Sequence, residues 1–409
     1  MAMTSLSLSS SLLDNKWKNI NTKKSDKQKK KRTRGRCSVA SATTTTSSSS
    51  ATSTTTTTRD INVLISGGTS GICFYLADEL LQNANKCTLV VCSRSQKRVD
   101  ECVNYLKEKY KTEKTKKKIY GVACDVSKPN EVERLKIFCA NVFECEKYET
   151  HWINGAGRVT RNAALHRVPT KEIIESLNAN LLGPLLMSRA AIELATSSPT
   201  KKMTIWQFGF SQFGASLSKS AATHKSTKTG LSQLTKSLNE EMQRENIANV
   251  FVRQMSPGLS LTTLLLKGAS PISKKIFNAL AEEPEICAEY IAAKMLDEKG
   301  VDDDKSPIEY LTPLDAVGRM IREAPNIILN NGGRHFDNKT GQRVKQPNAK
   351  YDDDGVKYLP FETSPARTRT TTTTLAKDNN NNNNSDDNEN DENDDDILTT
   401  QTVYRKPNV

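Results

Sequence analysis

The sequence predicts a doubly wound α/β domain built on a parallel sheet, with low-complexity segments at both ends of the chain. Short apolar runs alternate with longer amphipathic segments through the central part of the chain. The runs are continuously apolar, which is typical of strands buried on both faces of a sheet. A glycine-rich turn joins the first run to the first amphipathic segment. Strands that alternate with helices in this way form parallel sheets covered by helices.

Strands are expected at the apolar runs 61–66, 88–92, 119–124, 151–154, 203–208 and 250–255. Helices are expected where apolar residues recur at helical spacing, at 72–82, 97–109, 129–143, 170–195 and 222–246. The Lys-rich residues 107–118 are expected to form a solvated loop.

The two ends of the chain differ in composition from its centre. Of the 409 residues only 36% are hydrophobic, and the deficit is concentrated in residues 1–59 and 366–409. Neither segment can bury enough apolar surface to offset its chain entropy, so we expect both to be disordered. The folded domain is expected over residues 60–340, with a C-terminal extension over 341–365.

The net charge of +12 is distributed unevenly. Residues 1–59 carry twelve Lys or Arg and two Asp, which gives +10, and residues 366–409 carry five Lys or Arg and nine Asp or Glu, which gives −4. The central part therefore carries only +6. Because a nucleic-acid binder needs a basic face on its folded part, we expect no nucleic-acid partner. The remaining candidate for such a contact, residues 107–118, lacks interleaved aromatic residues that would stack on bases.

The chain has nine cysteines and four histidines. The cysteines form no CxxC motif, and no spacing matches a zinc site, so we expect no metal. Several of them lie in apolar runs, where Cys behaves as a small buried hydrophobe. This usage favours a reducing compartment.

The N-terminal residues 1–59 resemble a targeting segment. They are rich in Ser, Thr, Lys and Arg and almost free of acidic residues, which is typical of an organelle transit peptide. A disordered basic arm, or a nuclear signal among residues 29–36, is the alternative. No stretch of the chain approaches the roughly 18 consecutive apolar residues that cross a membrane.

The turn over residues 67–71 predicts a phosphate-binding site. A glycine turn between a strand and a helix presents backbone N–H groups and a helix N-terminus to a pyrophosphate. Glycine is needed there because a Cβ atom would hold the backbone away from the phosphates. A dinucleotide cofactor is therefore expected at this turn.

A series of segments matches, in order, the motifs of the short-chain dehydrogenase/reductase family, which the chain resembles. Residues 66–73 resemble its TGxxxGxG fingerprint, 154–157 its NNAG segment, 180–183 its NxxG helix motif, and 257–262 its PGxxxT segment. The resemblance implies a Rossmann-type fold and a nicotinamide cofactor. It assigns catalytic roles to Asn180, Ser211, His224 and Lys228. It assigns cofactor binding to Ser66, Gly67, Thr69, Ser70, Gly71, Ile72, Ser93, Arg94, Asp125, Val126, Asn154, Gly155, Ala156, Lys228, Pro257, Gly258 and Thr262.

Further segments resemble the chlorophyll b reductase group of this family. They include 124–126, 152–154, 226–228 and 256–258, and, beyond the cofactor-binding part, segments within 264–285 and at 310–313. The resemblance implies that a formyl group of chlorophyll b, or of a related tetrapyrrole or carbonyl compound, is reduced to a hydroxymethyl group in chlorophyll catabolism. It also implies a chloroplast location, peripheral thylakoid association without a transmembrane segment, and homo- or hetero-oligomers.

Arg94 favours NADPH over NADH. The second expected strand ends at Cys92 and is followed by Ser93 and Arg94. A site for NAD places an acidic residue here for the ribose hydroxyl, whereas a site for NADP places a cation for the 2′-phosphate. Lys97 and Arg98 follow closely and add positive charge.

Two departures from the family pattern concern small residues. Cys73 replaces the third glycine of the fingerprint, which serves close helix–strand packing more than phosphate contact. Gly155 replaces the second Asn of NNAG, and we expect a looser turn there. Neither change is expected to abolish the cofactor site.

The third departure concerns the proton donor. The family has a Tyr four residues before the catalytic Lys, and this chain has His224 four residues before Lys228. An imidazolium is a competent acid near neutral pH, but the nearby Lys228 charge favours neutral imidazole. Two readings therefore stay open: an enzyme that works through His224 or a water, or a catalytically silent nucleotide-binding module that partners an active relative.

Overall fold

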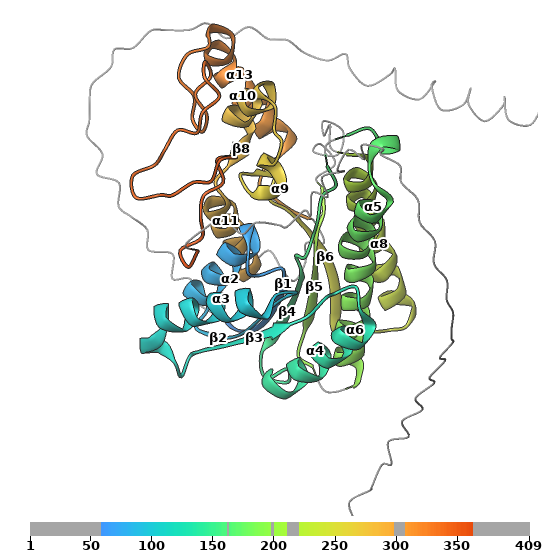
Figure 1. Cartoon of the computed structure of the whole chain (residues 1–409). Coiled ribbons are helices and arrows are strands. Elements are labelled where there is room, and N and C mark those ends of the chain that lie inside the picture. Colours follow the sequence, from blue (N-terminus) through green and yellow to red (C-terminus); the bar gives the residue numbers. More distant parts are fainter. Residues whose placement is uncertain (1–58, 162, 198–199, 211–220, 298–306, 363–409) are drawn as a thin grey trace, which may run out of the picture. The chain divides into compact units, whose positions relative to one another are not determined.

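The computed structural model describes residues 59–161, 163–197, 200–210, 221–297 and 307–362. Its centre is a seven-stranded sheet with strand order β3-β2-β1-β4-β5-β6-β9 (Figure 1). All pairings in this sheet are parallel, so the strands end at one common edge, here called the carboxyl edge. The predicted fold class is confirmed. The strands are β1 (Asp60–Ser66), β2 (Lys86–Ser93), β3 (Lys117–Ala123), β4 (Glu149–Asn154), β5 (Met203–Phe208), β6 (Val250–Ser256) and β9 (Ile308–Glu309).

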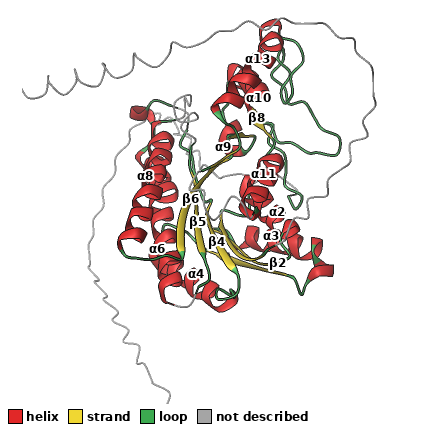
Figure 2. Ribbon diagram, turned by 180° about the vertical axis from the view of Figure 1, so that it is seen from behind, coloured by secondary structure: helices red, strands yellow, loops and turns green. Residues whose placement is uncertain are grey.

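Helices cover both faces of the sheet, as Figure 2 shows. On one face lie α2 (Gly71–Asn83), α3 (Gln96–Lys109) and α11 (Pro284–Leu296); on the other lie α4 (Pro129–Val142), α6 (Gly183–Ser197) and α8 (Ala222–Arg244). Each face buries its own apolar core. Trp206 belongs to the first core and Trp152 to the second, and both side chains are fully buried. Trp206 is thus a core residue rather than part of a ligand pocket.

The expected helix over residues 170–195 is interrupted. It consists of α5 (Thr170–Leu177), a π-helical turn η3 (Asn178–Leu182) and α6. A π-helical turn inserts an extra residue into the helical ladder and is frequent at functional sites. Here it contains Asn180, one of the predicted catalytic residues.

The solvated loop expected over 107–118 is shorter than predicted. α3 continues to Lys109, a 3₁₀ turn covers Lys111–Glu113, and β3 already begins at Lys117. Tyr110 is buried between them and its hydroxyl donates to the Asp78 side chain. The buried Tyr110 anchors a segment whose charged composition had indicated only solvent exposure.

Beyond β6 the chain forms a group of elements that we call the cap. It contains the two-stranded pair β7 (Leu259–Ser260) and β8 (Ala281–Glu282) and the helices α9 (Thr263–Leu266), α10 (Pro271–Leu280) and α13 (Pro313–Leu329). α10 packs on α13 through a small apolar cluster that includes Leu280 and Ala316. The sequence pattern had not indicated a helix or strand in this part of the chain.

The segment after α13 packs on the domain up to residue 362. The Asn278 side chain of α10 accepts hydrogen bonds from the backbone N–H groups of His335 and Phe336. Farther along, the Phe361 ring lies 5.1 Å from that of Phe74 in α2. The segment after α13 is therefore tied to the cap through residues 335–336 and to the sheet-covering helices through Phe361, which belongs to the expected extension.

The described part of the chain shows neither a membrane-spanning helix nor a disulfide bond. None of its helices is long and apolar enough to cross a lipid bilayer. Its eight cysteines are buried free thiols.

Candidate active site

The glycine turn after β1 approaches two other turns at the carboxyl edge. Gly67 and Gly71 have positive φ angles of 72° and 51°, which glycine adopts without strain. A Cβ atom on Gly67 would lie 3.0 Å from the Ala156 Cα atom, and one on Gly71 would lie 3.3 Å from the Thr262 Cγ2 atom. The structure therefore brings together three separate segments that the sequence assigned to cofactor binding.

The N-terminus of α2 is equipped to receive an anion. Ser70 is its N-cap residue, with extended backbone and no side-chain hydrogen bond to the helix, and the first turn contains no acidic residue. The first backbone N–H groups of a helix lack partners within the helix and carry partial positive charge. A phosphate group placed here would satisfy them.

Ser66 holds the turn after β4 in place. Its hydroxyl donates to the Ile153 carbonyl and accepts from the backbone N–H groups of Gly155, at 3.0 Å, and Ala156, at 3.2 Å. The expectation of a looser turn at Gly155 is wrong, because these hydrogen bonds pin it to the end of β1. Ser66 is itself buried and acts on this turn through its hydroxyl.

The two small-residue departures from the family pattern contact each other. A Cβ atom added to Gly155 would overlap the Cys73 Sγ atom and lie 2.7 Å from the Ser66 carbonyl oxygen. The Cys73 thiol lies 3.8 Å from the Gly155 carbonyl oxygen, within hydrogen-bond distance for sulfur. Cys73 therefore fills the space that a side chain at position 155 would need. The sequence alone does not show that residues 73 and 155 are adjacent.

Asn154 is anchored by two residues that no sequence motif indicates. Its amide nitrogen donates to Ser188 on α6 and to Gln207 on β5, both at 3.2 Å. Gln207 donates in turn to the Ser188 hydroxyl. The one signal in the sequence is a Gln within the apolar run 203–208, because a polar side chain in a buried strand needs hydrogen-bond partners.

The residues expected at the adenosine end lie after β2 and β3. The Ser93 hydroxyl is buried without a hydrogen-bond partner in the described structure, and the Arg94 side chain is exposed. Asp125 accepts from the backbone N–H and the hydroxyl of Ser127. Val126 packs against the start of α6.

Arg98 does not extend the positive charge of Arg94. Its guanidinium donates to the Thr69 carbonyl at 2.8 Å and forms an ion pair with Glu362 at 2.7 Å. Arg98 thus links the glycine turn to the C-terminal segment. Lys97 is exposed and lies 3.9 Å from Glu101.

Asn180 has its polar atoms occupied by the protein. Its oxygen accepts from the Arg158 backbone N–H at 2.7 Å, and its nitrogen donates to the Arg158 carbonyl at 2.7 Å and to the Thr227 hydroxyl at 3.2 Å. The Thr227 hydroxyl also donates to the His224 carbonyl. Asn180 therefore connects the π-helical turn to the part of α8 that carries His224 and Lys228.

His224 and Lys228 occupy successive turns of α8. The Lys228 ammonium donates to the Phe208 carbonyl at the end of β5, at 2.6 Å. The His224 ring stands edge-on to Phe210, and its Nδ1 atom is buried without a partner in the described structure. Both side chains thus point to the end of β5, next to the Asn154 turn.

Burial lowers the pKa values of both groups. Desolvation, and secondarily the Lys228 charge, lowers the pKa of His224 to about 4. Desolvation lowers the pKa of Lys228 to about 8, opposed by the nearby Cys73 thiol. At pH 7 the imidazole is therefore neutral and most Lys228 side chains are still protonated. This agrees with the expected effect of Lys228 on His224 and adds desolvation as the larger cause.

Of the remaining predicted residues, Pro257 and Gly258 are described by the structure and Ser211 is not. Pro257 and Gly258 follow β6, and Gly258 has a φ of 68°, with Leu311 packed 3.0 Å from where its Cβ would be. Ser211 lies outside the described residues. The described site therefore contains Asn180, His224 and Lys228 of the four predicted catalytic residues.

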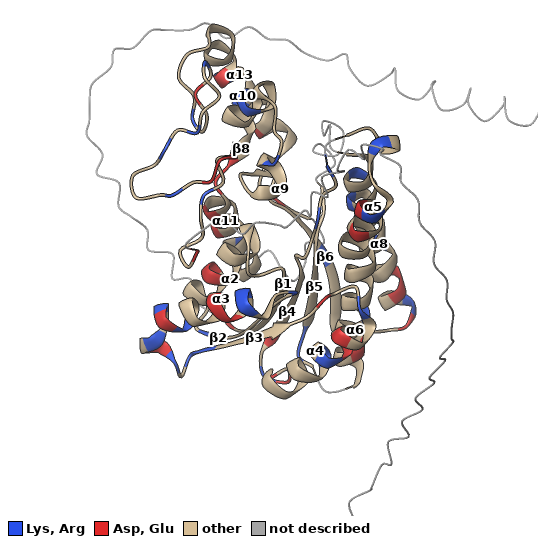
Figure 3. Cartoon of the chain, viewed as in Figure 1, with Lys and Arg blue, Asp and Glu red and all other residues tan. Residues whose placement is uncertain are grey.

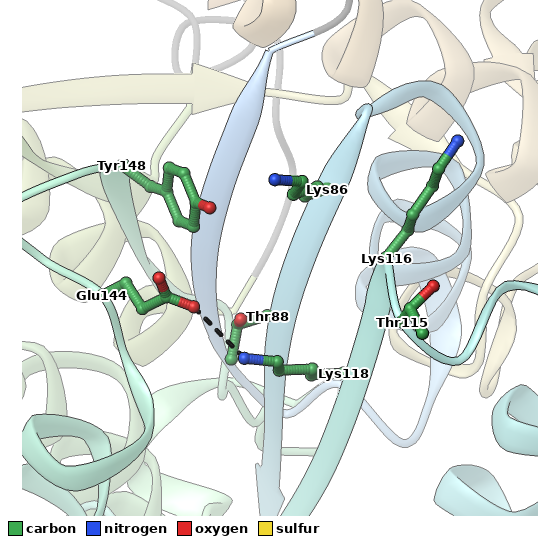
Figure 4. Close-up of a pocket in the computed structure, with 7 residues that line it drawn as sticks. All are labelled: Lys86, Thr88, Thr115, Lys116, Lys118, Glu144 and Tyr148. Atoms are coloured by element: carbon green, nitrogen blue, oxygen red, sulfur yellow. Dashed lines mark hydrogen bonds and ion pairs between the residues drawn. The ribbon is translucent and has the colours of Figure 1, made fainter.

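A separate pocket of about 260 Å³ lies at the opposite, amino edge of the sheet (Figure 4). It is bordered by Lys86, Lys116 and Lys118, and Lys118 donates to Glu144 at 3.2 Å. None of the predicted site residues lines it. Ion pairs such as this one also reduce the charge of the Lys-rich run, where Lys109 pairs with Asp78.

The fold and the carboxyl-edge site define a dinucleotide-binding α/β protein of the doubly wound class. A family model for short chain dehydrogenases matches residues 61–270. The chain belongs to the short-chain dehydrogenase/reductase family.

Two similar proteins are chlorophyll(ide) b reductases. The chain is 32% identical over 265 residues to the chloroplastic chlorophyll(ide) b reductase NOL of Oryza sativa, a match that covers 63% of this chain and 74% of the relative. It is 34% identical over 232 residues to NOL of Arabidopsis thaliana, covering 56% of this chain and 64% of that relative. Their names agree with the chloroplast location that the sequence predicts. The fold also resembles an L-sorbose reductase from Gluconobacter frateurii, with a TM-score of 0.51 at 18% identity over 62% of this chain and 96% of that one.

Proposed function

We propose that the chain is an NADPH-dependent reductase that converts the formyl group of chlorophyll b, or of a related tetrapyrrole, into a hydroxymethyl group. The observation that carries this proposal is the arrangement at the carboxyl edge. The glycine turn, the Asn154 turn and the Lys228 ammonium meet there in a chain that resembles chlorophyll(ide) b reductases. NADPH supplies the hydride for the carbonyl carbon when it is bound.

The residues at this edge fit a nicotinamide dinucleotide phosphate. Gly67 and Gly71 have positive φ angles and would bring a Cβ atom into tight contact with Ala156 and Thr262, and the first turn of α2 has no acidic residue. The buried, unpartnered Ser93 hydroxyl and the exposed Arg94 stand where a 2′-phosphate is recognised in this fold. Since Arg98 is engaged by Thr69 and Glu362, Arg94 is the cation that we assign to the 2′-phosphate.

We assign the proton that completes the reduction to Lys228 or to a water that it holds. Formyl reduction needs one proton on the oxygen for each hydride on the carbon. With a pKa of about 4, about one His224 side chain in a thousand carries a second proton at pH 7. The pKa of Lys228 is about 8, so its ammonium keeps a transferable proton at neutral pH. Asn180 acts as a positioning residue, because its amide fixes the Arg158 backbone and α8.

A second candidate is a catalytically silent module that binds NADPH and partners an active relative. The neutral, half-buried His224 in the place of a Tyr favours it, because loss of a general acid lowers the rate by about 10²–10⁴-fold.

One experiment separates these proposals. The full chain is titrated with NADPH by the change in cofactor fluorescence, and chlorophyllide b is then added while the hydroxymethyl product is followed. Binding with turnover supports the reductase, and binding without turnover supports the silent module. The variant His224→Tyr is measured in parallel, with an expected rate gain of about 10²-fold or more if the proton donor limits turnover. Failure to bind NADPH would contradict both proposals.

We also propose that the chain forms oligomers through α5, η3 and α6. Exposed apolar side chains on these elements form an uncovered surface: Ile174, Leu177, Leu182 and Leu185. A second copy of the chain, or an active relative, would cover this surface. Light scattering tests this, and Ile174→Lys with Leu177→Lys is expected to convert the oligomer into a monomer.

A further inference from the structure

The Arg98 guanidinium joins the glycine turn to the end of the described chain. Its Nη2 atom donates to the Thr69 carbonyl oxygen at 2.8 Å and to the Glu362 carboxylate at 2.7 Å. The Arg98 side chain is 22% exposed and that of Glu362 is 10% exposed, so the ion pair is largely shielded from water. Shielded charged hydrogen bonds are stronger than neutral ones and are screened less by salt. This contact therefore differs from an ordinary surface ion pair, whose net contribution is small.

The hydrogen bond to Thr69 fixes the direction of the next backbone N–H group. The Thr69 carbonyl and the Ser70 N–H belong to one planar trans peptide group, in which these two bonds point in opposite directions. The guanidinium also polarises this peptide group, which makes its N–H a better donor to an anion. The preceding carbonyl, of Gly68, lies 3.8 Å from the Cys102 thiol of α3, within hydrogen-bond distance for sulfur. Side chains of α3 thus orient two successive peptide groups of the turn.

The acid that holds Arg98 does not come from its own helix. Arg98 lies in the first turn of α3, where the positive end of the helix dipole disfavours a cation. Lys97 precedes it, and Asp100 and Glu101 follow, residues of this helix that are drawn in blue and red in Figure 3. Glu101 lies 3.9 Å from Lys97, and neither acid pairs with Arg98 within the described residues. Glu362 is therefore the carboxylate that stabilises Arg98 in this position.

Glu362 is held in place by its own part of the chain, residues 331–362, which we call the C-terminal segment. The Phe361 ring packs edge-on against Phe74 of α2 at 5.1 Å, and Leu359 is buried in the first apolar core. The second carboxylate oxygen of Glu362 accepts from the Leu359 backbone N–H at 2.9 Å. The carboxylate is thus presented to Arg98 in a fixed position, by a segment that lies beyond the part of the chain matched by the family model.

We infer that Glu362, acting through Arg98, is a positioning residue for the phosphate-binding turn and couples the C-terminal segment to cofactor affinity. It acts by holding the guanidinium on the Thr69 carbonyl. Because coupling between two sites is reciprocal, a bound dinucleotide stabilises the C-terminal segment by the same factor. The inference rests on the proposed function in taking this turn as the site of the NADPH pyrophosphate.

The first test measures the NADPH affinity of the full chain by cofactor fluorescence. Glu362→Gln and Arg98→Met are each expected to weaken NADPH binding about fivefold or more. In the double variant Glu362→Gln should add less than about a twofold effect, because its influence passes through Arg98. The matched control is Glu285→Gln, which removes the partly buried ion pair between Glu285 and Lys357 of the same segment. It should change the affinity by less than about twofold.

The second test measures backbone amide exchange and needs no turnover. Without NADPH, peptides covering residues 66–72 should exchange faster in Glu362→Gln than in the unsubstituted chain, whereas Glu285→Gln should leave them unchanged. With NADPH, peptides covering residues 355–362 should exchange more slowly in the unsubstituted chain, and this protection should be lost in Arg98→Met. An ion pair that serves stability alone would alter exchange in the C-terminal segment and leave both the turn and the affinity unchanged.

The inference is overturned if Glu362→Gln weakens NADPH binding no more than Glu285→Gln does, or if its effect persists in full beside Arg98→Met. Unchanged exchange at the turn in Glu362→Gln would also overturn it. The proposed function survives these outcomes as long as the unsubstituted chain binds NADPH. If the unsubstituted chain binds no NADPH, the proposed function fails and the inference fails with it.

Discussion

The contact between Cys73 and position 155 predicts a measurable energetic coupling. In Gly155→Ala the new Cβ overlaps the Cys73 Sγ atom and lies 2.7 Å from the Ser66 carbonyl oxygen. Overpacking of this kind destabilises a folded protein by about 1–3 kcal/mol. Cys73→Ala removes one of the two overlaps and by itself costs about 1 kcal/mol, as for the loss of one buried methyl-sized group. We expect the double variant to be about 1–2 kcal/mol more stable than the sum of the single effects predicts.

Urea denaturation of the full chain at pH 7 measures this coupling through a double-mutant cycle. The control is Gly157→Ala, whose Cβ would meet no atom nearer than the Asn180 Oδ1 atom at 3.4 Å, an ordinary contact. That variant should change the free energy of unfolding by no more than about 0.5 kcal/mol. If Gly155→Ala costs the same with and without the Cys73 thiol, the two departures from the family pattern are independent and the reasoning fails.

Three further predictions concern single groups. The pKa of His224 is about 4 in the folded state and near 6.5 in the unfolded state, so its contribution to stability is complete above pH 6.5 and is lost as the pH falls toward 4. Between pH 7 and pH 5 the unsubstituted chain should therefore lose roughly 2 kcal/mol more stability than His224→Gln, measured by urea denaturation. Equal losses for the two proteins would contradict the burial of this ring. Glu362→Gln removes the partly buried ion pair with Arg98 and should cost about 1 kcal/mol and speed proteolysis of the C-terminal segment, whereas Glu101→Gln at an exposed pair should do neither. Arg94→Asp should weaken NADPH binding roughly tenfold or more in a fluorescence titration and leave NADH binding unchanged or improved; equal loss for both cofactors would reject the assignment of Arg94 to the 2′-phosphate.

The sequence by itself determined the parallel sheet and the segments that form six of its seven strands, all but β9. Apolar runs bounded by Gly and polar residues mark strands, and those from β1 to β6 lie within one to two residues of their expected positions. The motif residues could be located as well, because each follows a strand and parallel strands end at one edge. Gly67, Asn154 and Pro257 are far apart in the chain yet had a predictable common place.

Only the tertiary structure decided how those residues interact. In the sequence Cys73 and Gly155 are two separate departures from the family pattern. In the structure the Cys73 thiol occupies the space that a side chain at position 155 would need. In the sequence Arg98 only adds positive charge near Arg94, and the structure shows that it forms an ion pair with Glu362, 264 residues away.

The cap and the exposed apolar side of α13 also depended on the three-dimensional structure. An amphipathic pattern shows that a helix has an apolar side, but not whether a neighbour covers it. In α13 the packing against α10 uses one part of a wide apolar arc and leaves Leu314, Ile321 and Ile328 in solvent. Burial depends on contacts between segments distant in sequence, and local patterns do not contain that information.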